Sequence, residues 1–136
     1  MRRLLTIRTS LACATLLAAL AAQAAAPAVP SDDDLRMAGE CQALGVSIIE
    51  NGNDFRDPTW RQAALVLMFA PAVLADAKFE VPFKEHPVYR TALESTRAEL
   101  ASQPPSPASP AYGSRLKPCL DWAARLPALN ETRGKP

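Results

Sequence analysis

Apolar side chains recur every three to four positions after residue 31, which is the pattern of a helix with one buried face. The stripe consists of Leu35, Ala38, Cys41, Leu44 or Gly45, and Ile48. Ser31 precedes it as a candidate N-cap, and Asp34 stands where its carboxylate can complete a capping box. Asn51-Gly52 follows the stripe and favours a left-handed backbone, which commonly ends a helix. We therefore predict a first helix from Ser31 to about Glu50.

The second segment is apolar on every side. Asp57 and Pro58 supply a cap and a first-turn proline, and no polar residue occurs from Ala63 to Ala75. A helix of this kind is normally buried all round, so we expect it at the centre of a bundle. Pro71 is expected to bend it, because a proline removes one backbone hydrogen bond and crowds the carbonyl of Leu67.

The same apolar run supports a second interpretation, in which part of its surface stays exposed and binds a protein partner or a second copy of the chain. A domain of this size has barely enough helix to wrap such a segment, and large exposed apolar patches mark interaction sites. The residues expected on this surface are Leu65, Val66, Phe69 and Val73. Their exposure in the monomer separates the two interpretations.

Two more helices are expected in the second half of the chain. Residues 79–83 alternate in polarity and contain a proline, which predicts an extended connector, and Glu85-His86-Pro87 then starts a helix. Its inward positions are Val88, Tyr89, Ala92, Leu93, Thr96 and Leu100. Residues 102–110 contain four prolines and predict an extended Pro/Ser linker without internal hydrogen bonds. The last helix is predicted from about Ser114 or Pro118 to Leu126.

The first residues have the layout of a secretory signal peptide. A positively charged start precedes an apolar stretch from Leu11 to Ala22, and Ala22-Gln23-Ala24 offers the small residues that a signal peptidase needs. We expect cleavage after Ala24 and export to the periplasm. The alternative is an uncleaved membrane anchor, but this stretch is well short of the roughly 20 residues that span a bilayer.

Cleavage would leave Cys41 and Cys119 as a pair in an oxidising compartment, which predicts a disulfide between the first and last helices. Closing so long a loop stabilises a domain by on the order of 4 kcal/mol. We expect residues 25–30 to form a flexible tail, 31–127 a single helical domain, and 128–136 a polar tail. The predicted fold is all-α: a small antiparallel bundle of three to four helices with one disulfide and a central helix kinked at a proline.

Composition argues against two classes of partner. The chain has 15 Lys and Arg residues and 14 Asp and Glu residues, and the predicted cleavage removes three of the basic residues and none of the acidic ones. The mature chain is therefore weakly acidic and has no basic cluster. Neither nucleic acid nor an anionic membrane surface is an expected partner.

Catalytic and cofactor motifs are missing from the sequence. It contains no haem-attachment, zinc-protease, nucleophile-elbow or phosphate-loop motif, so we predict no catalytic, metal-binding or cofactor-binding residue and no enzyme activity. The single histidine, His86, precedes a proline and is expected to be exposed or to cap a helix. Axial ligation of haem iron by His86 with Met37 or Met68 is a cofactor hypothesis, although Met68 is better explained as core filler.

A short exported helical chain with one bridge between distant helices is similar in layout to HdeA-type acid-stress chaperones. It also resembles the immunity proteins that bacteria keep in the periplasm against injected cell-wall hydrolases. The resemblance covers no motif and transfers no residue role. Our leading hypothesis is a non-catalytic protein that binds and inhibits or sequesters a protein partner. The alternatives are an acid-stress chaperone whose apolar surface is uncovered on acidification, and a small enzyme or haem carrier.

Overall fold

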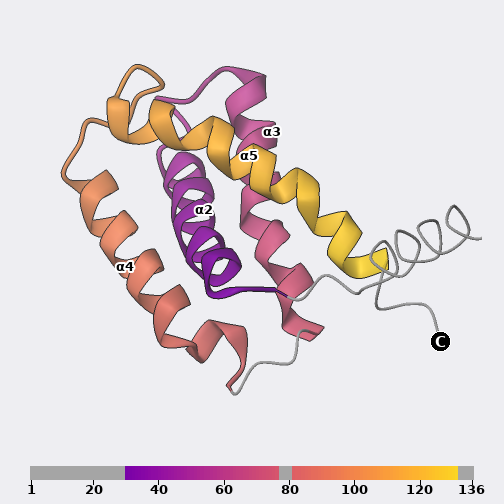
Figure 1. Cartoon of the computed structure of the whole chain (residues 1–136). Helices are drawn as coiled ribbons and strands as arrows, with labels where there is room; N and C mark the ends of the chain where they lie inside the picture. The colour runs from indigo at the N-terminus through magenta and orange to yellow at the C-terminus, as the bar shows by residue number, and fades with distance from the viewer. Residues whose placement is uncertain (1–29, 77–80, 132–136) are drawn as a thin grey trace, which may run out of the picture.

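The computed structural model describes residues 30–76 and 81–131. Within them the chain forms four α-helices and two 3-10 helices and no strand, which confirms the predicted all-α bundle (Figure 1). The elements are α2 (Asp32–Glu50), α3 (Pro58–Phe69), η1 (Ala70–Asp76), η2 (Phe83–Glu85), α4 (Pro87–Ala101) and α5 (Pro110–Glu131). The predicted signal peptide and nearly all of the tail expected at 25–30 lie outside the described residues, as do residues 132–136.

Helix α2 begins and ends on side-chain hydrogen bonds. At its start the predicted capping box is present: the Ser31 hydroxyl accepts from the Asp34 N–H, and the Asp34 carboxylate accepts from the Ser31 N–H at 2.9 Å. At its end, Asn51 Nδ2 donates to the Ser47 carbonyl at 2.8 Å. The left-handed stop expected at Asn51-Gly52 is wrong, because no described residue has a positive φ. The helix ends instead with the Asn51 side-chain amide hydrogen-bonded to the Ser47 carbonyl.

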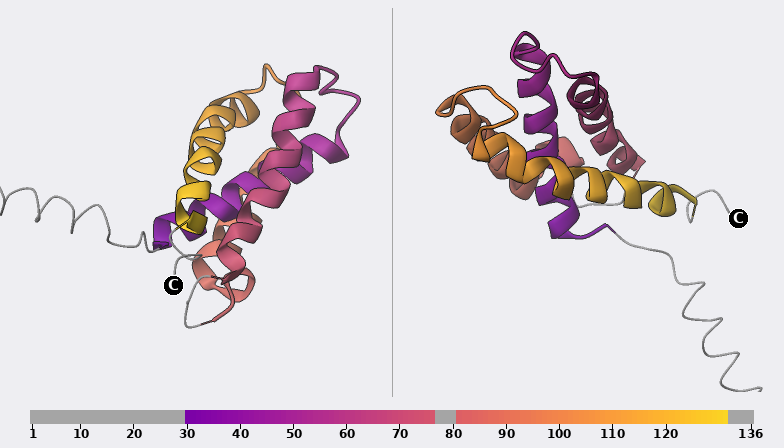
Figure 2. Two further views of the ribbon diagram at one scale, coloured as in Figure 1. Left: turned by 90° about the vertical axis from the view of Figure 1, so that its right-hand side faces the viewer. Right: turned by 90° about the horizontal axis from the view of Figure 1, so that it is seen from above.

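Helix α2, rather than the apolar segment, is the centre of the bundle. It packs against α3, α4 and α5, whereas α3 packs against α2, η1 and α5 and leaves one side open (Figures 1 and 2). The expectation that the apolar run occupies the centre is therefore wrong. Small residues at several positions of α2, such as Ala38, Gly39 and Ala43, allow neighbours to approach it closely, and hydrophobicity alone did not reveal this.

Two glycines of α2 mark these close approaches. A Cβ on Gly39 would lie 2.5 Å from the Tyr89 carbonyl oxygen of α4, and one on Gly45 would lie 2.8 Å from the Ala64 carbonyl oxygen of α3. Side-chain carbons do not approach backbone oxygens so closely. The absence of a side chain at each position therefore lets the backbones of α3 and α4 rest directly on α2.

The helices do not all run in opposite directions. Figure 1 shows α3 antiparallel to α2, as expected for neighbours joined by the short loop 51–57, whereas α4 runs in the same direction as α2 and α5 crosses them. Short connections favour antiparallel neighbours, and more residues separate η1 from α4 than separate α2 from α3. The antiparallel arrangement predicted for the whole bundle thus applies to the α2–α3 pair.

The apolar run changes its hydrogen-bonding pattern near Pro71. The α-helix ends at Phe69, and residues Ala70–Asp76 continue as the 3-10 helix η1 with Pro71 fully buried. Proline cannot donate the backbone hydrogen bond that an uninterrupted α-helix needs at this point. The interruption therefore falls where the sequence places the proline.

Helix α4 matches its prediction closely. It begins at Pro87 behind the N-cap His86, whose Nδ1 accepts from the Val88 N–H at 3.3 Å. The Tyr89 hydroxyl donates to Gln42 Oε1 of α2, and burial raises the pKa of Tyr89, which keeps this donor protonated. Just before α4, Phe83–Glu85 forms the short helix η2, so the connector expected at 79–83 is helical at Phe83, whereas residues 81–82 are not helical and residues 79–80 lie outside the described residues.

The Pro/Ser segment and the last helix differ from expectation. Residues 102–110 form turns with internal hydrogen bonds, among them Ser109 N–H to the Ser106 carbonyl at 3.0 Å, so the extended linker is wrong. Helix α5 begins at Pro110, because proline suits the first helical turn, and it continues through Pro118 to Glu131. Residues 128–131, expected in the polar tail, therefore belong to this helix.

Replacing Gly39 by alanine tests the close contact between α2 and α4. Alanine stabilises a helix by about 1 kcal/mol relative to glycine. At position 39, however, its Cβ would overlap backbone atoms of α4, and overpacking of this kind costs about 1–3 kcal/mol. We expect Gly39→Ala to lower the urea midpoint. Gly52→Ala is the control, because a Cβ there meets nothing closer than 3.4 Å. An unchanged or higher midpoint for Gly39→Ala would contradict the close packing.

Candidate functional site

The outer side of α3 carries three exposed apolar residues, Leu65, Val66 and Phe69, which we call the α3 face. Their exposed fractions are 50%, 50% and 68%. Leu65 and Phe69 stand four residues apart and Val66 and Phe69 three apart, so the side chains are neighbours on the helix surface. The fourth predicted member, Val73, lies in η1 and packs partly against the core. The structure therefore brings together three of the four residues.

The opposite side of α3 explains why this face is open. Ala64 and Leu67 are fully buried, and Gly45 of α2 meets the helix at these residues. One side of α3 is therefore used for packing, and the described residues supply no element that covers the other. Burial in the monomer accounts for only part of the apolar run.

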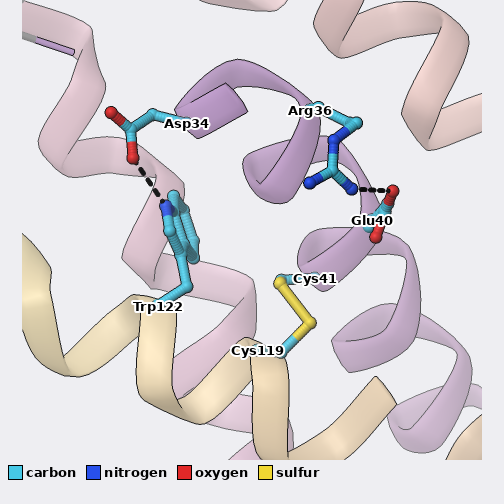
Figure 3. Close-up of a disulfide and its surroundings, with 6 residues drawn as sticks. All are labelled: Asp34, Arg36, Glu40, Cys41, Cys119 and Trp122. Atoms are coloured by element: carbon cyan, nitrogen blue, oxygen red, sulfur yellow. Dashed lines mark hydrogen bonds and ion pairs between the residues drawn. A yellow bond between two sulfur atoms is a disulfide. The ribbon is translucent and has the colours of Figure 1, made fainter. Parts of the chain in front are cut away.

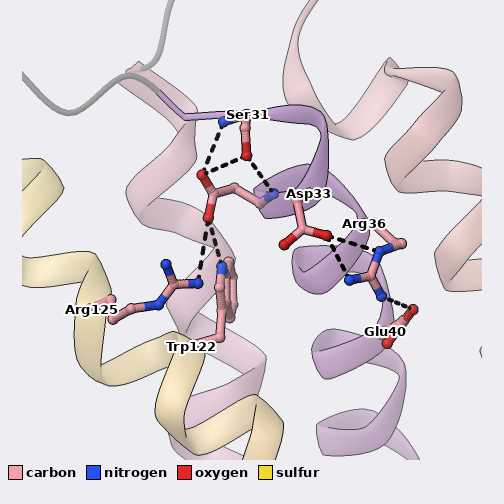
Figure 4. A network of polar contacts seen from close by, with 7 residues as sticks. Ser31, Asp33, Arg36, Glu40, Trp122 and Arg125 are labelled. Atoms are coloured by element: carbon pink, nitrogen blue, oxygen red, sulfur yellow. Dashed lines mark hydrogen bonds and ion pairs between the residues drawn. The ribbon is translucent and has the colours of Figure 1, made fainter.

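Asp34 joins the start of α2 to Trp122 of α5 (Figure 3), and Figure 4 adds Ser31 and Arg125. Its Oδ2 accepts from Ser31 and its Oδ1 accepts from Trp122 Nε1 at 3.1 Å, while the Arg125 guanidinium lies 4.0 Å away. The Trp122 side chain is 2% exposed, so this hydrogen bond satisfies an otherwise buried donor. The sequence pattern indicated the capping role of Asp34, whereas its bond to a residue 88 positions away had no local signal.

A separate ion cluster lies on the surface of α2. The Arg36 guanidinium binds Asp33 at 2.6 Å and Glu40 at 2.7 Å, and hydrogen bonds to Asp33 and then Glu40 raise the pKa of Arg36. All three residues belong to one helix and are at least partly exposed. Such pairs contribute little to stability, and we interpret them as an ordinary helix surface.

The predicted disulfide between Cys41 and Cys119 is present (Figure 3). It joins the middle of α2 to α5 with a Cα–Cα distance of 5.4 Å, and both cysteines are almost fully buried. Trp122 lies one turn further along α5, so the bridge and the Asp34–Trp122 bond hold the same pair of helices. Burial on this scale suits a structural bridge rather than an exchanging thiol pair.

The three residues of the haem hypothesis lie on or next to three different helices. His86 caps α4 through Nδ1, Met37 lies on α2 partly buried against the core, and Met68 is half-buried on α3. In the described part of the chain no three His, Cys, Asp or Glu side chains form a group that could hold a metal ion. None of the described helices is long and apolar enough to cross a membrane.

One cavity of about 290 Å³ lies between the C-terminal halves of α2 and α4, beside the loop that precedes α5. Its floor includes Ser47 and Tyr112, whose hydroxyl oxygens are 2.6 Å apart. Glu50 of α2 and Arg97 of α4 also line it. This cavity has no signature in the sequence, because its residues come from segments that are far apart in the chain.

Loss of the disulfide should destabilise the fold strongly. A bridge across 78 residues removes unfolded-state entropy worth on the order of 4 kcal/mol. We expect the double variant Cys41→Ala/Cys119→Ala to unfold at much lower guanidinium concentration than the oxidised wild type, and reductant to lower the wild-type midpoint alone. Equal midpoints with and without reductant would show that the bridge contributes no stability.

Comparisons with known proteins add no functional residue. No protein-family model matches the chain, and neither a curated protein nor a solved structure matches it. The candidate sites are therefore those that the structure itself distinguishes, which are the α3 face and the cavity beside Ser47.

Proposed function

We propose that this chain is a non-catalytic binding protein that uses the α3 face to dock a protein partner, in the manner of an inhibitor or immunity protein. The observation that carries the proposal is the exposure of Leu65, Val66 and Phe69 as neighbours on one helix. Apolar residues exposed singly are ordinary, whereas a contiguous group on one surface is typical of interaction sites. Large apolar and aromatic side chains supply much of the energy at protein interfaces.

The surroundings of the α3 face indicate the chemistry of the partner. Arg61 lies one turn before Leu65, and its guanidinium donates to the Gly52 carbonyl at 3.3 Å but has no carboxylate partner among the described residues. The face therefore has an apolar centre and a cationic edge. A complementary partner surface would present apolar side chains with a carboxylate on the Arg61 side.

The size of the α3 face limits what it can do alone. Full burial of one large apolar side chain contributes about 1.5–3 kcal/mol, and each of these three side chains is already partly buried. Their remaining contribution is on the order of 3–5 kcal/mol, which is less than the roughly 8 kcal/mol of a micromolar complex. The partner must therefore also contact neighbouring side chains, and Arg61 is the first candidate.

Export to the periplasm is part of the same proposal. Support comes from the buried Cys41–Cys119 bridge, because disulfides persist mainly in oxidising compartments. An inhibitor that acts in that compartment needs no catalytic group. It needs a stable scaffold and one complementary surface.

Binding can be tested by a pair of matched variants. We expect Leu65→Ser/Phe69→Ser to lose at least tenfold in affinity for a stoichiometric partner captured from periplasmic extract, because it removes the apolar centre. Ile49→Ser is the control, since Ile49 is 42% exposed on α2 and lies outside the α3 face. The thermal midpoints of both variants should stay close to that of the wild type.

Two results would reject the α3 face as the docking surface. One is a captured partner that binds the double variant as tightly as the wild type. The other is the absence of any stoichiometric partner while the wild type remains a monomer. A partner lost equally by Ile49→Ser would place the binding surface on α2 instead.

A stress chaperone is the second candidate function. The carboxylate contacts and the disulfide that hold α5 favour it over a small enzyme or haem carrier. The contacts of α5 with α2 and α4 include carboxylates: Asp34 accepts from Trp122 and lies 4.0 Å from Arg125, and Glu99 accepts from Arg115 at 2.5 Å. Protonation of carboxylates at low pH removes such pairs and leaves the chain strongly positive, which loosens packing. The disulfide would still retain α5.

Dye binding and aggregation suppression between pH 7 and pH 2 test the chaperone function. A chaperone of this kind should gain both properties on acidification, as α5 separates from α2 and apolar core residues become accessible. Reduced protein serves as the control, because it should gain dye binding without the restraint on α5. No gain of either property in oxidised protein at low pH would exclude this function.

A further inference from the structure

The cavity between α2 and α4 divides into two sides of different chemistry. The α2 side ends in Glu50 and Asn51, and the last turn of α2 contains no basic residue. The Glu50 carboxylate and the Asn51 side-chain oxygen are acceptors, while Asn51 Nδ2 is engaged with Ser47. The carbonyls at a helix C-terminus add partial negative charge. This side of the cavity is therefore suited to a cation with several N–H donors.

The opposite side offers donors. Arg97 of α4 and Gln103 of the following loop line it, and neither makes an ion pair or side-chain hydrogen bond within the described residues. A guanidinium and an amide N–H can together hold a carboxylate. This side is therefore suited to an anion.

Glu50 and Arg97 face one cavity without neutralising each other. Both side chains line it, yet they are not within the 4 Å of an ion pair in the described structure. Val46 also lines the cavity, as do Ser47 and Tyr112, whose hydroxyl groups bond to each other. A ligand that bridges the cavity would bring opposite charges to its two ends and a short apolar body between them.

We propose that this cavity binds a small zwitterion of the amino-acid or dipeptide class. The ammonium group lies against Glu50 and Asn51, the carboxylate against Arg97 and Gln103, and the side chain against the half-buried Val46. A volume of about 290 Å³ is at the lower end of ordinary ligand pockets, which suits a ligand of this size. The site is separate from the α3 face, because α3 and α4 lie on different sides of α2.

Calorimetry with L-leucine and L-alanyl-L-leucine tests the site on the full chain. We expect saturable binding of at least one of them with a Kd of about 1 mM or tighter, a range that ligands of this size reach with ordinary efficiency. Blocking either end of that ligand, by N-acetylation or by C-terminal amidation, should weaken binding roughly tenfold. Whichever probe binds more tightly sets the length of the ligand.

Variants connect each end of the ligand to one side of the cavity. Glu50→Gln should weaken binding of the unmodified ligand, so that it binds no more tightly than the N-acetylated form. Arg97→Gln should make the unmodified ligand bind no more tightly than the C-terminal amide. Arg90→Gln is the control, because Arg90 lies on the same helix, pairs with Glu94 at 3.7 Å and does not line the cavity. All three side chains are exposed, so the fold should be unaffected.

Three outcomes would overturn the proposal. They are the absence of heat with both probes at 10 mM, equal binding of the free and end-blocked forms, and unchanged end selectivity in both cavity variants. Leu65→Ser/Phe69→Ser should bind the zwitterion like the wild type. A failure of the α3 face and a failure of the cavity can therefore be distinguished.

Discussion

Direct backbone contact on α2 is the constraint on which the rest of this fold depends. Gly39 allows the backbone of α4 to approach, Gly45 does the same for α3, and Cys41 lies between them in sequence and binds α5 covalently. Three neighbours thus meet one helix within two turns. Because α2 takes the centre, α3 lies at the side of the bundle, and its apolar outer surface stays in contact with solvent.

The parts of the fold that the sequence predicted are those with local or covalent causes. The capping box at Ser31 and Asp34 and the His86 cap follow from short spacings, and the disulfide was predicted from an even pair of cysteines in a chain that we expected to be exported. The identity of the central helix could not be predicted from the sequence. Hydrophobicity reflects how favourable it is to remove a side chain from water, and it says little about how closely two backbones can approach. The length of α5 was underestimated, since Pro118 is tolerated inside it.

The two candidate sites also differ in whether a local sequence signal predicts them. The α3 face was predicted because Leu65, Val66 and Phe69 lie on adjacent turns of one run without polar residues, which contains more apolar residues than a small core needs. The cavity was not predicted, because Glu50 and Arg97 become neighbours only when α4 packs alongside α2 in the same direction. Parallel packing of that kind is a tertiary property with no signature in either segment.

The disulfide also determines how the molecule would respond to a protease. Since Cys41 and Cys119 enclose α3, α4 and the Pro/Ser segment in one covalent loop, a single cut within that loop opens a ring rather than dividing the chain. The disulfide keeps the two fragments joined as one molecule, and its mass increases only by that of one water. A nicked molecule therefore keeps α2 and α5 together after damage that would release half of an unbridged bundle.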